Sequence, residues 1–291
     1  MKHTQTLKGY FFIIASALIF GCMPLGAKFI YAEGVNSLSL VFLRNCLAIP
    51  ILAFLAKSQG HSLRIGRNAL FEISIIAIMG CCITPVLLFA SYNYLASGTA
   101  TIFHFIYPAM VVLGGIIFLR EKIRKNIFFC VLICTIGICL FYNPGEPIDP
   151  RGSVLALLSG VTYAAYILLL SVSKHKEISG FKFSFYITVI CSVVMLLFCL
   201  FSGQLTFPAT LKGWLLCLVF SLSLCVGAVV LFQQGTFLIG GQRAAILSTV
   251  EPITSIFVGV LVFQEAISIR TAIGSLLVVL ASVLIAVLDV E

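Results

Sequence analysis

Ten apolar segments follow one another along this sequence, separated by short polar stretches. A helix that spans a bilayer needs about 20 apolar residues, and most of these segments have that length. The chain is 61% hydrophobic and only 10% charged, so it has more apolar surface than a soluble core could bury. We therefore predict an all-α membrane protein with about ten transmembrane helices. The predicted spans cover residues 9–31, 38–57, 70–93, 97–119, 126–142, 152–172, 181–201, 211–237, 242–264 and 269–288.

The first apolar segment resembles a signal peptide because a basic stretch precedes it. However, it continues to Tyr31 without a small-residue cleavage site, so we interpret it as the first span. The eleven cysteines all lie in apolar segments and form no Cys-x-x-Cys pair. Cysteine acts here as a small apolar residue, and we predict no metal and no cofactor.

The basic residues predict how the chain is inserted. With the N-terminus in the cytoplasm, thirteen lysines and arginines lie inside and four outside, which follows the positive-inside rule. We therefore expect an inner-membrane protein with both termini in the cytoplasm, and no nucleic-acid partner despite the net charge of +8. The inside group is Lys2, Lys8, Lys57, Arg64, Arg67, Arg120, Lys122, Arg124, Lys125, Lys174, Lys176, Lys182 and Arg243; the outside group is Lys28, Arg151, Lys212 and Arg270.

The two halves of the chain match each other at a shift of 143–144 residues. Gly9 then meets Gly152, and the pattern Pro-x12-Glu recurs in the fourth and ninth segments. Each half holds five spans, an odd number, so the second half must be inserted upside down. Inverted repeats around a site at the midplane are typical of secondary transporters. We predict one repeat over 1–143, a joint loop over 144–150 and an inverted repeat over 151–291.

Three motifs carry a family resemblance. They are Phe42-Leu43-Arg44-Asn45 in the second span, Tyr107-Pro108 through Leu119-Arg120-Glu121 in the fourth, and Glu251-Pro252 through Val262-Phe263-Gln264-Glu265 in the ninth. With these motifs the whole chain resembles the EamA family of the drug/metabolite transporter superfamily. The resemblance implies a ten-span carrier with a central cavity, which exports or exchanges small metabolites such as amino acids. It also implies dimer-like packing, and a homodimer is possible.

Charged groups within spans are costly and usually face a cavity or a partner, so they are the first candidates for a substrate site. Glu251, near the middle of the ninth span, either faces the cavity and binds a cation or proton, or joins its helix to a neighbour. Arg44 in the second span either binds a carboxylate or phosphate, pairs with Glu251 or backbone carbonyls, or reaches the headgroups.

Further polar residues complete the candidate substrate site. His104 could line the cavity or relay a proton, and Tyr107 should lie at the depth of its repeat partner Glu251. Each of these residues could equally make a contact between helices. The candidate substrate-binding residues are Arg44, His104, Tyr107, Glu251, Tyr163, Gln233 and Asn93. We expect Pro108 and Pro252 to kink their helices and shape the cavity, and Glu121 and Glu265 to anchor helix ends.

Motifs of nucleotide-driven pumps and of hydrolases do not occur in the sequence. We therefore expect a secondary transporter, not an enzyme, that moves a small polar or amphiphilic metabolite outward by alternating access. An amino acid or related zwitterion is the best candidate, since Arg44 and Glu251 supply opposite charges. Proton coupling is possible. The alternatives are a membrane sensor and an integral membrane enzyme.

Overall fold

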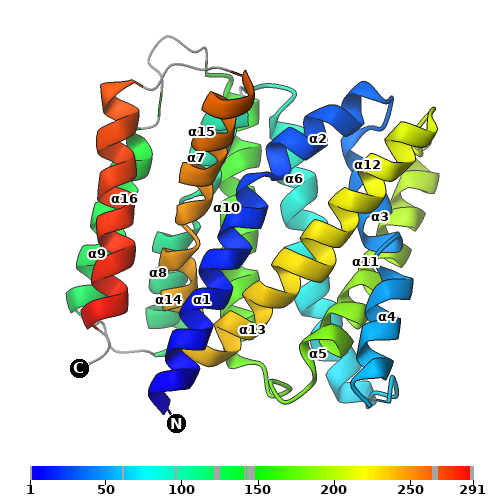
Figure 1. Ribbon diagram of the computed structural model, residues 1–291, viewed down its shortest axis with the longest axis horizontal. Helices are drawn as coiled ribbons and strands as arrows, with labels where there is room; N and C mark the ends of the chain where they lie inside the picture. The colour runs from blue at the N-terminus through cyan, green and yellow to red at the C-terminus, as the bar shows by residue number, and fades with distance from the viewer. Residues whose placement is uncertain are drawn as a thin grey trace.

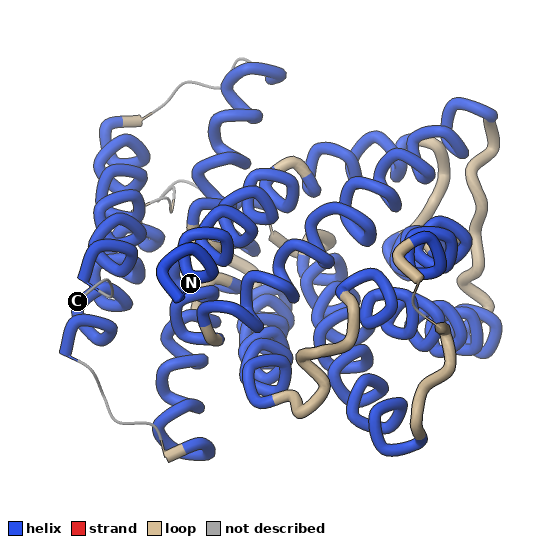
Figure 2. The backbone as a smooth tube through the Cα atoms, turned by 60° about the horizontal axis from the view of Figure 1, so that its bottom comes forward, coloured by secondary structure: helices blue, strands red, loops and turns tan. Residues whose placement is uncertain are grey.

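The chain forms a bundle of helices, seen from two directions in Figures 1 and 2. The computed structural model describes residues 2–60, 62–95, 97–120, 125–140, 142, 148–263 and 268–288, and no strand occurs among them. Helices of the first half are α1 Lys2–Gly21, α2 Met23–Ala32, α3 Ser37–Cys46, α4 Ile49–Ser58, α5 Arg67–Ala77, α6 Thr84–Ser91, α7 Ser97–His104, α8 Tyr107–Leu119 and α9 Lys125–Cys139. Helices of the second half are α10 Pro150–Val172, α11 Gly180–Ser202, α12 Leu211–Ser221, α13 Val229–Ile239, α14 Gly241–Leu247, α15 Val250–Phe263 and α16 Ile269–Leu288.

These helices form ten successive segments, as the apolar pattern predicts. Seven segments are long and apolar enough to cross a membrane, α9 and α16 supply two shorter apolar ones, and α14 with α15 supplies the tenth. Successive segments run in opposite directions, and α1 begins at the same end of the bundle at which α16 ends (Figure 1). The two halves are therefore inverted relative to each other, since equivalent segments of the halves point in opposite directions.

Four of the ten segments are broken near their middle, which the sequence analysis did not predict. The breaks lie between α1 and α2, α3 and α4, α7 and α8, and α14 and α15. Each break is followed by a proline in the first turn of the next helix; these prolines are Pro24, Pro50, Pro108 and Pro252. Proline fits a first turn because its missing N–H would have no partner there. The kinks expected at Pro108 and Pro252 are thus complete helix breaks just before the proline.

The third and eighth segments each contain a π-helical turn, at Ile78–Ile83 and Leu222–Ala228. The two turns begin 144 residues apart, which is the shift that relates the repeats. In the first turn the backbone N–H and the hydroxyl of Thr84 both donate to the carbonyl of Met79, the hydroxyl at 2.8 Å. The repeats therefore share local irregularities as well as helix order.

Close helix contacts follow the same symmetry. A Cβ atom added at Gly9 would lie 2.4 Å from a methyl carbon of Ile239 and 3.0 Å from Leu238. At the equivalent Gly152 it would lie 2.7 Å from both Leu95 and Tyr94. Residues 94 and 95 are the counterparts of 238 and 239 at a shift of 144. Each half thus docks the start of its first helix against the other half in the same way.

We expect Gly160→Ala to lower stability, since a Cβ there would lie 2.5 Å from the backbone oxygen of His104. A backbone atom cannot move aside, so α10 would be forced away from the break after α7, at a cost of about 1–3 kcal/mol. The measurement is the thermal unfolding of the detergent-purified protein. Gly66→Ala is the matched control, because a Cβ at Gly66 meets nothing within 4 Å and its φ is −73°. Equal unfolding temperatures for Gly160→Ala and the control would contradict this account.

Candidate functional site

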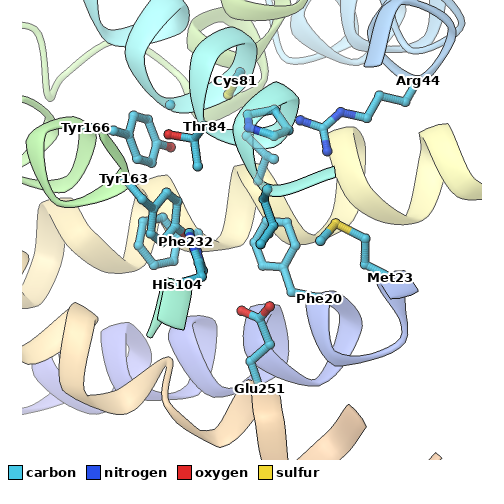
Figure 3. A pocket seen from close by; sticks show the side chains of 14 residues that line it. Phe20, Met23, Arg44, Cys81, Thr84, His104, Tyr163, Tyr166, Phe232 and Glu251 are labelled. Atoms are coloured by element: carbon cyan, nitrogen blue, oxygen red, sulfur yellow. The ribbon is translucent and has the colours of Figure 1, made fainter. Parts of the chain in front are cut away.

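A cavity of about 60 Å³ lies between the two halves, beside the helix breaks. Figure 3 shows its side chains converging from both repeats. The first half supplies residues of α1, α2, α3, α6 and α7, and the second half supplies residues of α10, α13 and α15. The lining residues are Phe20, Met23, Arg44, Gly80, Cys81, Thr84, Pro85, Leu88, His104, Tyr163, Tyr166, Val229, Phe232 and Glu251. Four of the seven predicted substrate-binding residues therefore line one cavity.

Arg44 enters the cavity from the last turn of α3, and its side chain is only 5% exposed. The end of this helix is fixed through the Arg44 carbonyl, which accepts bonds from Ser221 Oγ at 2.5 Å and Cys225 Sγ at 3.3 Å. The guanidinium is not held in this way. Its Nε is enclosed without a hydrogen-bond partner, and no carboxylate in the described ranges lies within 4.0 Å of it. A buried positive charge thus faces the cavity without a counter-charge.

Glu251 enters the cavity from the first turn of α15. Its depth is fixed by α1, because Gly21 packs directly against the Glu251 backbone: a Cβ at Gly21 would lie 2.7 Å from the Glu251 carbonyl oxygen. Figure 3 shows the carboxylate and the Arg44 guanidinium entering from different sides, with Phe20 drawn between them. The ion pair between Arg44 and Glu251, one of the predicted alternatives, is not formed. Neither residue makes a side-chain hydrogen bond within the described part of the chain.

His104 is the last residue of α7, and α10 determines which of its nitrogens carries the proton. Its Nδ1 lies 2.8 Å from Ser159 Oγ, which also lies 2.6 Å from the carbonyl oxygen of Ala156. We assign the single hydroxyl proton to the Ala156 carbonyl, the shorter of the two contacts, which makes Nδ1–H the donor to Oγ. In the neutral ring this leaves Nε2 as a hydrogen-bond acceptor. The ring itself packs against Tyr163, with centroids 5.4 Å apart.

Tyr107 and Gln233 are fully buried and lie behind the cavity wall. The Tyr107 hydroxyl is 2.7 Å from Ser248 Oγ, which joins α8 to the break between α14 and α15. Gln233 accepts from Ser184 at 2.7 Å and donates to the Tyr166 hydroxyl at 3.4 Å. Both are thus engaged in contacts between helices, which was the alternative to direct binding.

Three aromatic rings from α10 and α13 form a continuous side of the cavity. Tyr163 lies 5.6 Å from Tyr166 and 5.8 Å from Phe232, measured between ring centroids, and the rings of Tyr166 and Phe232 are stacked at 6.1 Å. The sequence analysis selected Tyr163 but not Phe232 or Phe20. With 25 phenylalanines in a membrane protein, nothing in their spacing distinguishes a cavity residue from a lipid-facing one.

Other predicted residues lie elsewhere. Asn93 is exposed in the turn after α6 and does not line the cavity. Pro108 and Pro252 are both buried, directly behind the breaks that carry His104 and Glu251. Glu121 and Glu265 lie outside the described residues, as do most residues of the predicted joint loop. Of that loop the structure describes Ile148 to Pro150, where Asp149 caps α10 by accepting from the N–H of Arg151 at 2.7 Å.

Known proteins share this architecture. The sequence of Bacillus subtilis YcbK, described as an uncharacterized transporter, is 24% identical over 94% of this chain and 91% of its own length. An uncharacterized inner membrane transporter of Salmonella typhimurium, YicL, is 23% identical over 98% of this chain and 97% of its own. The pseudopaline exporter CntI of Pseudomonas aeruginosa is 24% identical over 84% of each chain. A solved crystal structure with 16% identity has the same fold, with a TM-score of 0.79 over 99% of both chains.

The profile of the EamA-like transporter family matches this chain twice, at residues 7–143 and 150–287. Together the two matches cover nearly the whole sequence, and each falls on one of the inverted halves. This chain is a multi-pass membrane protein that belongs to the EamA-like transporter family.

Proposed function

We propose that this protein is a secondary transporter that carries a small amphiphilic zwitterion outward across the inner membrane by alternating access. An amino acid is the best candidate for the substrate. The observation that carries the proposal is that Arg44 and Glu251 line one cavity without pairing with each other or with any other described side chain. A zwitterion brings both missing counter-charges. Its carboxylate would bind the guanidinium, and its cationic end would bind Glu251.

The free-energy cost of burying two charged groups supports this proposal. Removing a charged group from water costs several kcal/mol unless a partner compensates. A protein could lower this cost by letting Arg44 and Glu251 pair, yet they enter the cavity apart from each other (Figure 3). Buried charges kept apart in a cavity are therefore better explained by a ligand than by stability.

The apolar lining indicates what the rest of the substrate is like. Besides the two charged groups, rings and aliphatic side chains line the cavity, among them Phe20, Tyr163 and Phe232. Such a surface favours an apolar or aromatic side chain over a second polar group. An amino acid with an apolar side chain combines a zwitterionic head with that body.

The size and position of the cavity support alternating access. Ligand sites usually measure about 300–1,000 Å³, so a cavity of about 60 Å³ must widen to admit an amino acid. Both repeats line it, and rocking one inverted repeat against the other would widen it toward each side in turn. The basic residues favour cytoplasmic termini. Export would match the role of the related pseudopaline exporter CntI. No observation on the described residues favours a sensor or an enzyme.

We expect Arg44→Ala and Glu251→Gln each to reduce transport by roughly ten- to a hundred-fold, because each removes a charge-assisted bond to substrate worth about 1.5–3 kcal/mol. The substrate would first be chosen by a thermal-shift screen of purified protein against amino acids, nucleosides and cationic drugs. Counterflow in proteoliposomes would then measure the rates. Neither change should lower the unfolding temperature, since neither charge has a partner to lose.

Arg64→Ala and Glu177→Gln are the matched controls, because both side chains are exposed and lie outside the cavity. They should transport at the wild-type rate. If the folded Arg44 and Glu251 variants also transport at that rate, the site assignment is wrong.

We expect an inward-directed proton gradient to accelerate substrate export, because a carboxylate in a low-dielectric cavity can take up a proton once the substrate cation has left it. Among the described residues Glu251 is the only carboxylate that lines the cavity, so Glu251→Gln should lose the acceleration. The measurement is flux from proteoliposomes with and without an imposed pH difference. A wild-type rate that does not respond to the gradient would exclude proton coupling.

A further inference from the structure

The repeats are equivalent to each other, so a contact between two residues can be compared with the contact between their counterparts at the same shift. Tyr107 and Ser248 correspond to Glu251 and His104 at a shift of 144, in that order. A contact between the first pair therefore predicts closeness between the second pair. The glycine contacts at Gly9 and Gly152, and the two π-helical turns, show that this correspondence holds in the structure.

The two equivalent pairs differ in the way they meet. Tyr107 and Ser248 are bonded directly at 2.7 Å and are fully or almost fully buried. His104 and Glu251 make no hydrogen bond, and no nitrogen–oxygen distance between them is within 4.0 Å. Both line the cavity instead, beside Tyr163 and Phe232 (Figure 3). One pair thus closes the contact between the repeats, whereas the other leaves it open to the cavity.

The chemistry of the open pair explains why it does not close. Tyr107 and Ser248 are both hydroxyls, so either can supply the proton of the closed bond. In the open pair Ser159 fixes the proton of neutral His104 on Nδ1, which leaves Nε2 as an acceptor. The carboxylate of Glu251 is also an acceptor. Two acceptors cannot bond to each other, but they can share one donor placed between them.

Resting on the transport function proposed above, we infer that Glu251 and His104 Nε2 together bind the cationic end of the substrate through its N–H groups. The ligand class is a primary or secondary ammonium. A quaternary ammonium has no N–H and cannot satisfy either acceptor. His104 is then a specificity-determining residue, and Ser159 is a positioning residue that keeps Nε2 as the acceptor.

The aromatic rings offer a competing way to recognise the cation, and the two ways predict different effects of methylation. Tyr163, Tyr166 and Phe232 alone resemble the aromatic surfaces that attract quaternary ammonium groups. If those rings recognised the cation, methylation of the nitrogen would preserve or improve binding. If the two acceptors recognise it, methylation must weaken binding.

The experiment compares L-phenylalanine with its N,N,N-trimethyl derivative by isothermal titration calorimetry on the full-length protein in detergent. The two probes share the carboxylate and the ring, and the derivative has three methyl groups in place of the three N–H hydrogens; the His104 and Ser159 variants separate the loss of N–H groups from the added bulk. We expect the wild type to bind the trimethyl derivative at least tenfold more weakly. His104→Phe keeps an aromatic ring without an acceptor and leaves Glu251 as the remaining acceptor, so it should lower the ratio of the two affinities several-fold. Ser159→Ala keeps His104 but frees its tautomer, and should reduce the ratio partway.

The Arg44→Ala variant distinguishes a failure of this inference from a failure of the proposed transport function. It should weaken both probes equally and leave the ratio of affinities unchanged, because the carboxylate is common to both. Equal wild-type affinities, or an unchanged ratio in both His104→Phe and Ser159→Ala, would overturn the inference while the transporter stands. Failure of the folded wild type to bind either probe would overturn it too, and the proteoliposome assay would then decide the transport function separately.

Discussion

Backbone hydrogen bonding in lipid is the constraint on which the rest of this structure depends. A span can be interrupted only where the freed carbonyls find partners within the protein. Two of the four breaks meet this condition with serine side chains from other segments. Ser255 Oγ donates to the carbonyl of Gly21, at the end of α1, at 2.7 Å, and Ser221 Oγ donates to the carbonyl of Arg44 near the end of α3. The interrupted helices are therefore held together where they meet in the centre of the bundle.

This constraint also determines where the charged and polar side chains of the site lie. A break needs protein on all sides, so it lies where both repeats converge, and the side chains beside it are kept away from lipid. His104 ends α7 before one break, and Glu251 opens α15 after the equivalent break. Arg44 lies in the last turn of α3, before another break, where the helix dipole favours a positive charge. Charges that would be costly elsewhere in a span gather around one cavity because the breaks are there.

The features that the membrane constrains most strongly are the ones that could be predicted from the sequence. Apolar length predicts the segments, and the odd number of spans per repeat predicts the inversion. Arg44, His104, Tyr163 and Glu251 are found together at the cavity because charged and polar groups in a span must face inward. The breaks and π-helical turns were missed because hydropathy does not record how a helix is interrupted. Asn93 was misplaced because an amide near a span end is as suited to an exposed turn as to a cavity.

The difference in sequence between the two repeats makes the site asymmetric. An inverted duplication first creates two equivalent contacts, and a symmetric carrier would have the same residues in both. Here one contact holds a hydroxyl pair, Tyr107 and Ser248, which can supply its own proton and close. The other holds His104 and the carboxylate of Glu251, which need an added donor or a proton to close. In the function proposed above, the same backbone geometry serves as a fixed joint in one place and as a ligand site in the other. Function is gained by substitution at positions where the fold already tolerates a polar group.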